Sequence, residues 1–189
     1  MNRFITFEGI DGCGKTTQIK LLSNYLNFKN INNKIVREPG GTNVSEKIRS
    51  ILLDSKNKIS SYTETLLFVS ARSQLIHEII KNSIISKQFI LCDRYTDSTL
   101  SYQGYGRDLN LSALKVLNNF ATSSIIPDMT FILDIEVEES IKRKMDNSLD
   151  RMELEGKIFM EKVRKGYLNI AKSDKERYFL INCNNKDIK

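Results

Sequence analysis

Residues 4–16 read FITFEGIDGCGKT, an apolar run followed directly by the pattern GxxxxGKT. The glycines let the backbone curl so that several N–H groups point at one anion, and a helix starting there adds its positive dipole end. Lys15 can then reach the β- and γ-phosphates of a nucleotide, and the Thr16 hydroxyl can ligate Mg²⁺. The residues of this phosphate loop, which we expect to bind the nucleotide, are Gly9, Ile10, Asp11, Gly12, Cys13, Gly14, Lys15 and Thr16. An ordinary Gly-rich turn is the alternative interpretation.

The composition favours one soluble globular domain. The chain has 189 residues, of which 40% are hydrophobic and 28% charged, and this is enough for one compact core. The three cysteines are odd in number and lack CxxC spacing, and no charged-plus-apolar leader precedes the first apolar run, so we expect a reducing cytoplasm. No apolar stretch approaches the roughly 20 residues that span a bilayer, which argues against a membrane partner.

The net charge of +6 does not indicate a nucleic-acid partner. Residues 142–189 carry most of the excess, with 13 Lys and Arg against 8 Asp and Glu. These charges alternate in sign, as in the segment 172–177, which reads KSDKER. That pattern is typical of a solvated face, and the interleaved aromatic residues of single-strand binders are absent.

Five short apolar runs alternate with amphipathic stretches and predict the fold. The runs are Phe4–Phe7, Lys34–Arg37, Phe89–Cys92, Thr130–Ile135 and Tyr178–Cys183. Because they are continuous rather than alternating, we expect strands buried on both faces. Four helical stripes fall between them: Ile19, Leu22, Leu26; Leu66, Leu67, Ile76, Ile79, Ile80; Leu114, Leu117, Ala121; and Ile158, Val163, Tyr167, Ile170. The prediction is a three-layer α/β/α domain, a five-stranded parallel sheet with helices on both faces.

The expected carboxyl ends of the strands carry charge to one rim, where ligands of such sheets bind. The first run leads into the phosphate loop, the second into Arg37-Glu38-Pro39, and the third into Asp93-Arg94. A carboxylate at position 93 would lie near the Mg²⁺ of Thr16, and the Arg94 guanidinium matches a phosphate. A plain loop after the second run and a solvated Asp–Arg pair after the third are the alternatives.

A phosphate loop indicates a nucleotide but not its fate. A GTPase needs an NKxD segment, and Asn185-Lys186-Asp187 has the wrong spacing. A mechanochemical ATPase usually needs a longer chain. A small-molecule kinase needs one domain, a second anion site and a mobile cationic cover. Residues 142–153, which contain Arg143, Lys144 and Arg151, suit such a lid, although an exposed charged helix end is the alternative.

The chain also resembles bacterial thymidylate kinases over almost its whole length. The resemblance rests on FEGIDGCGKTTQ (7–18), REPGGT (37–42), EKIRSILLD (46–54), LLFVSARSQL (66–75), DRYTDSTLSYQGYGR (93–107), PDMTFILD (127–134) and LDRME (149–153). It implies Mg²⁺-dependent transfer of the ATP γ-phosphoryl group to dTMP, giving dTDP for dTTP synthesis. It also implies a homodimer, which the apolar helix expected over residues 65–80 independently favours.

The resemblance assigns roles to individual residues. Catalysis would use Lys15, Asp93, Arg94 and a lid cation, Arg143 or Arg151, with Lys144 as a further candidate; Thr16 and Asp93 would place Mg²⁺. The dTMP site would comprise Asp11, Glu38, Pro39, Arg49, Phe68, Arg72, Arg94, Ser98, Tyr102 and Gln103. In it Phe68 would stack on thymine, Arg72 would bond its O4 edge, and Tyr102 would lie under the sugar.

Two features depart from the family pattern. Gly12 stands where some members have an arginine, so the lid must supply the catalytic cation. The chain also stops soon after its fifth apolar run, where the family usually continues into a final helix, and we expect that helix to be missing. A nucleotide-gated binding module and a kinase for another nucleoside monophosphate remain the alternative functions.

Overall fold

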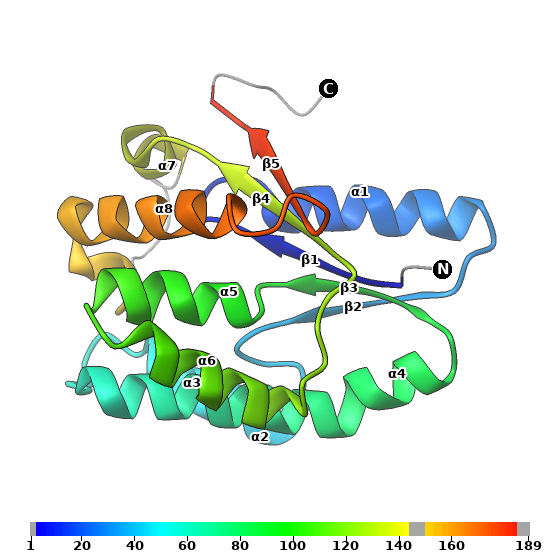
Figure 1. Ribbon diagram of the computed structural model, residues 1–189, viewed down its shortest axis with the longest axis horizontal. Helices are drawn as coiled ribbons and strands as arrows, with labels where there is room; N and C mark the ends of the chain where they lie inside the picture. Colours follow the sequence, from blue (N-terminus) through cyan, green and yellow to red (C-terminus); the bar gives the residue numbers. More distant parts are fainter. Residues whose placement is uncertain (1–2, 144–149, 185–189) are drawn as a thin grey trace.

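The protein is described by a computed structural model that covers residues 3–143 and 150–184. Its strands are β1 (Phe4–Glu8), β2 (Asn33–Arg37), β3 (Phe89–Asp93), β4 (Met129–Asp134) and β5 (Tyr178–Asn182). They form one sheet in the order β2-β3-β1-β4-β5, and every neighbouring pair is parallel (Figure 1). The predicted five-stranded parallel sheet is confirmed, and each strand end lies within one residue of its expected position.

Helices occupy the segments between the strands. They are α1 (Lys15–Phe28), α2 (Asn43–Leu53), α3 (Ser61–Leu75), η1 (Ile76–Ile80), α4 (Lys81–Ile85), α5 (Thr96–Thr99), η2 (Leu100–Gly106), α6 (Leu111–Thr122), α7 (Val137–Arg143), η3 (Glu153–Glu155) and α8 (Lys157–Ala171). Helix α3 continues without a break through η1 into α4 along one side of the molecule (Figure 1). Over the described ranges, the structure contains no helix long and apolar enough to cross a bilayer.

Side-chain caps explain where several of these helices begin. The Thr42 hydroxyl accepts a hydrogen bond from the Ser45 amide at 3.1 Å ahead of α2, and Ser60 does the same for Thr63 at 3.2 Å ahead of α3. Such caps satisfy amides that have no partner inside the helix. Thr42 and Ser60 therefore fix the starts of α2 and α3.

The two faces of the sheet bury alternate residues of the same strands. Phe4, Ile90 and Cys92 pack against Leu75 and Ile76 at the junction of α3 and η1. By contrast, the adjacent residues Ile5, Phe7 and Leu91 belong to the cluster that contains Ile19 and Leu26 of α1. Because successive side chains of a strand point to opposite faces, this division places helices on both faces, as predicted.

The prediction that all strands are buried on both faces is wrong for the two edge strands. Only Val36 is buried in β2, and no residue is buried in β5, where Leu180 is 52% exposed. An edge strand has one strand neighbour and less helix cover than a central one. Two stripe residues are also misplaced, since Leu66 is 53% exposed and Ile158, in the first turn of α8, is 80% exposed.

Candidate functional site

The phosphate loop joins the end of β1 to the start of α1 and requires glycine. Gly9 has a φ of +135°, and a Cβ there would lie 2.4 Å from the carbonyl oxygen of Leu133. Gly14 caps α1 with a φ of +100°. Residues that carry a side chain rarely adopt these backbone angles, so this turn requires glycine at both positions. The loop lies between a strand and a helix, as predicted, and its binding of an anion stays a prediction.

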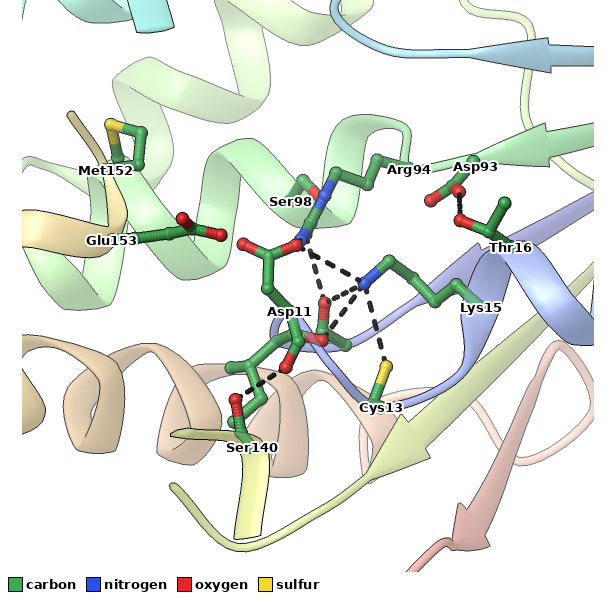
Figure 2. A network of polar contacts seen from close by, with 12 residues as sticks. Asp11, Cys13, Lys15, Thr16, Asp93, Arg94, Ser98, Ser140, Met152 and Glu153 are labelled. Atoms are coloured by element: carbon green, nitrogen blue, oxygen red, sulfur yellow. Dashed lines mark hydrogen bonds and ion pairs between the residues drawn. The ribbon is translucent and has the colours of Figure 1, made fainter. Parts of the chain in front are cut away.

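Lys15 turns its ammonium group back into this loop (Figure 2). Its Nζ donates to the carbonyl oxygens of Gly9 at 2.9 Å and Ile10 at 3.0 Å, and it lies 4.0 Å from Asp11 Oδ1. The side chain is only 6% exposed. The cation is therefore held at the place where the loop amides would gather an anion.

Thr16 and Asp93 bring two oxygen donors together at the start of α1 (Figure 2). The Thr16 hydroxyl donates to Asp93 Oδ2 at 2.8 Å. Oxygen ligands suit Mg²⁺, which commonly takes one or two protein ligands and completes its shell with phosphate oxygens and water. Among the described residues, no group of three or more His, Cys, Asp or Glu side chains could hold a metal alone. The pair thus fits Mg²⁺ bound together with a nucleotide.

Two cavities adjoin the loop. The first, which we call the Phe68 cavity, is lined by all ten residues predicted for the dTMP site: Asp11, Glu38, Pro39, Arg49, Phe68, Arg72, Arg94, Ser98, Tyr102 and Gln103. The second, the loop cavity, is lined by Gly12, Gly14, Lys15, Thr16, Asp93 and Arg143 among others. Asp11, Glu38, Arg49 and Arg94 line both. A ligand in one cavity would therefore meet a ligand in the other at these four side chains.

Arg94 lies at this junction and is strongly bonded (Figure 2). Its Nη2 donates to Asp11 Oδ1 at 2.7 Å, and its Nη1 donates to the Gly9 carbonyl at 3.0 Å. The guanidinium also lies 5.1 Å from the centre of the Tyr102 ring. Burial opposes its charge, but the electrostatic interactions with Tyr102 and Asp11 raise the pKa of Arg94. The Arg94 guanidinium is therefore charged and directed at the phosphate loop.

Arg72 is almost fully buried and fixed by four acceptors. Its Nε donates to Glu38 Oε2 at 2.6 Å, its Nη1 to Thr99 and Asn118, and its Nη2 to the Tyr95 carbonyl at 2.9 Å. An arginine has five N–H donors, so one hydrogen on Nη2 remains for a ligand. The pKa of Glu38 is raised to about 7, because the effect of burial exceeds the opposing effect of the Arg72 charge.

Glu8 bonds residues that surround Arg94, a role that the sequence did not reveal. Its carboxylate accepts hydrogen bonds from the Tyr95 amide at 2.7 Å, the Ser98 hydroxyl at 2.6 Å and the Tyr167 hydroxyl at 3.1 Å. Burial, with the negative charge of Asp97, raises the pKa of Glu8 to about 7. The residue ends β1, but only the fold shows that Tyr167 of α8 reaches it.

The lid cations occupy different surroundings. Arg143 lines the loop cavity, and its Nη1 donates to the Gly12 carbonyl at 3.4 Å. Arg151 lines neither cavity; it is buried, with its Nη1 donating to Glu64 Oε2 at 2.7 Å and its Nε to the Leu52 carbonyl at 2.6 Å. Lys144, the third candidate, lies outside the described residues.

Sequence reasoning missed several residues of the site. Thr99, Leu53, Asp150 and Met152 line the Phe68 cavity. Glu64, which is fully buried, ties Arg151 to Gln103 and Arg107. Nothing in the local pattern marks Glu64, because its partners lie 39 to 87 positions away in the chain.

The raised pKa of Glu8 makes a prediction about stability. The folded protein holds a proton on Glu8 up to about pH 7, whereas an exposed glutamate releases it near 4.5. This contribution to the free energy of unfolding is fully present below pH 4.5 and is lost as the pH rises through 7. Glu8→Gln should therefore show a shallower fall in the free energy of unfolding between pH 4.5 and 7 than the wild type, measured by urea titration.

Glu176 is exposed, so Glu176→Gln is the matched control. It should show the same dependence of the free energy of unfolding on pH as the wild type. Equal slopes for Glu8→Gln and the wild type would contradict the burial argument.

Comparison with known proteins agrees with this geometry. A family model described as thymidylate kinase matches residues 7–189. The thymidylate kinase of Caldanaerobacter subterraneus subsp. tengcongensis is 48% identical over 179 residues, covering 95% of this chain and 86% of the relative. That of Thermoanaerobacter sp. (strain X514) is 49% identical, with 95% and 88% covered. The crystal structure of thymidylate kinase from Ehrlichia chaffeensis superimposes with a TM-score of 0.77 at 38% identity, covering 95% of this chain and 91% of that one. Because the family model matches residues 7–189 and both relatives are nearly half identical over 95% of this chain, the chain belongs to the thymidylate kinase family.

Proposed function

We propose how this chain transfers the γ-phosphoryl group of ATP to dTMP, the reaction that its family membership indicates. The triphosphate of ATP would lie in the loop cavity, and dTMP would lie in the Phe68 cavity. The observation that carries this proposal is that the ten residues predicted for dTMP line one cavity, which shares Asp11, Glu38, Arg49 and Arg94 with the loop cavity. Two phosphates bound from opposite sides would meet there.

Lys15 and the loop amides would hold the β- and γ-phosphates. In the structure the Lys15 ammonium donates hydrogen bonds to two carbonyl oxygens of the loop. A polyphosphate would attract the ammonium more strongly than these carbonyls do, because its oxygens carry full negative charges. Thr16 and Asp93 would hold Mg²⁺, which neutralises charge on the phosphates when bound. Positioning and charge stabilisation then supply the acceleration.

Arg94 and Arg49 would hold the dTMP phosphate as the acceptor. Both line the two cavities, and the Arg94 guanidinium is aimed at the loop. The attacking atom is a phosphate oxygen, which is already an anion, so no general base is needed. The two phosphates would be aligned for in-line attack, in which the acceptor oxygen bonds the γ-phosphorus as the bond to ADP breaks.

The nucleoside of dTMP would be read inside the Phe68 cavity. Phe68 offers an aromatic face to the base, and the remaining N–H of Arg72 offers a donor to O4. Asp11 would approach the 3′-hydroxyl. The Tyr102 ring, packed edge-on against Phe159 and Tyr167, would lie under the sugar and disfavour a 2′-hydroxyl.

Lys15→Ala tests the loop. We expect kcat for dTMP to fall by about 100-fold or more with the fold intact, because a charge that stabilises the transferring phosphoryl group is lost. The measurement is ADP release with ATP, Mg²⁺ and dTMP. Lys29→Ala, at the exposed far end of α1, is the control. Near-normal turnover of Lys15→Ala would refute the assigned role.

Arg143 is the lid cation that we assign to the transferring phosphoryl group, since its guanidinium already bonds the phosphate loop at Gly12. Arg143→Ala should lower kcat by about 100-fold or more with a smaller change in KM, because the charge develops in the transition state. Lys142→Ala on the same helix α7 should retain nearly wild-type kcat. Equal losses in the two variants would contradict the assignment.

We also propose a homodimer in the cytoplasm, with no membrane or nucleic-acid partner. The three cysteines are free, which suits a reducing compartment. Within the helix expected to form the dimer contact, Ile76 and Ile80 are buried in the chain itself, so that helix alone offers less apolar surface than expected. Exposed apolar side chains are found instead at Leu66 of α3 and at Val116 and Phe120 of α6, a helix that contacts α3.

Sedimentation tests the dimer. The wild type should sediment as a dimer at micromolar concentration, and Phe120→Glu, which places a charge on a side chain that is 84% exposed, should sediment as a monomer with unchanged circular dichroism. A monomeric wild type would overturn the proposal.

A further inference from the structure

We propose that Glu64 is a positioning residue that sets the choice of pyrimidine by fixing the amide of Gln103. Glu64 lines neither cavity and would not touch the substrate. Gln103, in η2, lines the Phe68 cavity together with Phe68 and Arg72. The inference rests on the proposed function, in which the base of dTMP lies beside these three side chains.

The Glu64 carboxylate is fully buried and surrounded by donors. Its Oε1 accepts from Gln103 Nε2 at 2.9 Å and Arg107 Nε at 3.2 Å. Its Oε2 accepts from Arg107 Nη2 at 2.9 Å and Arg151 Nη1 at 2.7 Å. Burial alone would raise the pKa of Glu64, but the hydrogen bonds from Arg107, Gln103 and Arg151 lower it. The two arginines therefore keep this carboxylate ionised and able only to accept.

An acceptor-only partner decides which way the Gln103 amide points. An amide carries donors on nitrogen and an acceptor on oxygen, and only the nitrogen can bond a carboxylate. With Nε2 held by Glu64, Oε1 is turned away from Glu64. No donor from the described part of the chain bonds this oxygen, which is not itself fully buried although the Gln103 residue is only 1% exposed. Gln103 thus presents an acceptor oxygen to the cavity, and its amide cannot reverse while Glu64 stays ionised.

The fixed oxygen matches one pyrimidine edge and opposes the other. Thymine and uracil present an N3–H donor beside the O4 acceptor, whereas cytosine presents an N3 acceptor beside an amino donor. An acceptor from Gln103 next to a donor from Arg72 complements the first pattern and opposes the second. Facing cytosine, the Gln103 oxygen and the ring nitrogen would both lack a proton, and a buried polar group without a partner is costly.

The direct test replaces Glu64 with glutamine, whose amide can offer either a donor or an acceptor to Gln103. The readout is the ratio of kcat/KM for dCMP to that for dUMP, with dissociation constants where turnover is too slow. These substrates share the sugar and phosphate and both lack the 5-methyl group. Glu64→Gln should raise the dCMP:dUMP ratio between about 5- and 150-fold, because Gln103 can then reverse. A wild-type ratio would overturn the proposal.

Two controls separate positioning from general damage. Glu155 accepts a hydrogen bond from the same Arg107 but has no bond to Gln103, so Glu155→Gln should keep the wild-type ratio. Gln103→Met removes the amide, and adding Glu64→Gln in that background should leave the ratio unchanged. An equal rise in the ratio for Glu155→Gln, or in the Gln103→Met background, would assign the effect to structural loss and contradict the proposal.

Glu64→Gln leaves two arginines beside a neutral partner and could fail to fold. In that case the side-chain amide protons of Gln103 in the wild type, assigned by their absence in Gln103→Met, decide the question by NMR. Slow solvent exchange that persists when dUMP binds is expected, and fast exchange would overturn the proposal. A wild type that phosphorylates neither dTMP nor dUMP would instead defeat the proposed function.

Discussion

The parallel pairing of β1 with β3 is the constraint on which the site depends. In this register Phe7 lies opposite Asp93, so both strands end at the same level of the sheet. The Arg94 amide then donates to the Phe7 carbonyl at 3.0 Å, and the Arg94 side chain donates to Gly9. A slip by one residue would turn Asp93 to the other face and separate it from Thr16. The register of this strand pair therefore positions both the phosphate loop and the Asp93–Arg94 pair.

Charged side chains, most of them buried, gather at the junction of the two cavities and behind Gln103, and each has a partner of opposite charge. Arg94 faces Asp11, Arg72 faces Glu38, and Glu64 faces two arginines. A buried charge without a partner costs several kcal/mol, so each of these pairs ties the fold to its site. The pairs join segments that are distant in sequence. They link the phosphate loop to the residue after β3, the residue after β2 to α3, and α3 to both Arg107 and Arg151. The charged side chains that we propose to bind the substrates thus also link the walls of the cavity.

The periodic and glycine-rich parts of the sequence carry most of the fold. Continuous apolar runs predicted the five strands, and Gly9 and Gly14 predicted a loop whose conformation only glycine tolerates easily. Periodicity could not show which strands form the edges, so the exposure of β2 and β5 was missed. Strand order depends on long-range pairing, which no local pattern reports.

The site divides in the same way between local and long-range information. Asp93, Arg94 and Thr16 follow from their places at strand and helix ends, whereas the Phe68 cavity residues were found through motifs of a family. Glu8, Glu64 and Tyr167 escaped because their significance arises from partners that folding brings together. Arg151 shows the converse, since its place in the expected lid segment suggested a lid cation, whereas its guanidinium is bonded to buried Glu64.

A crystal structure with Mg²⁺, dTMP and a non-hydrolysable ATP analogue would show whether the two phosphates meet at Arg94. We expect the γ-phosphate of the analogue against Lys15 and the dTMP phosphate within hydrogen-bonding distance of the Arg94 guanidinium, so that the two phosphates face each other. A dTMP phosphate bound away from Arg94, with that guanidinium still directed at Asp11 and Gly9, would contradict this expectation.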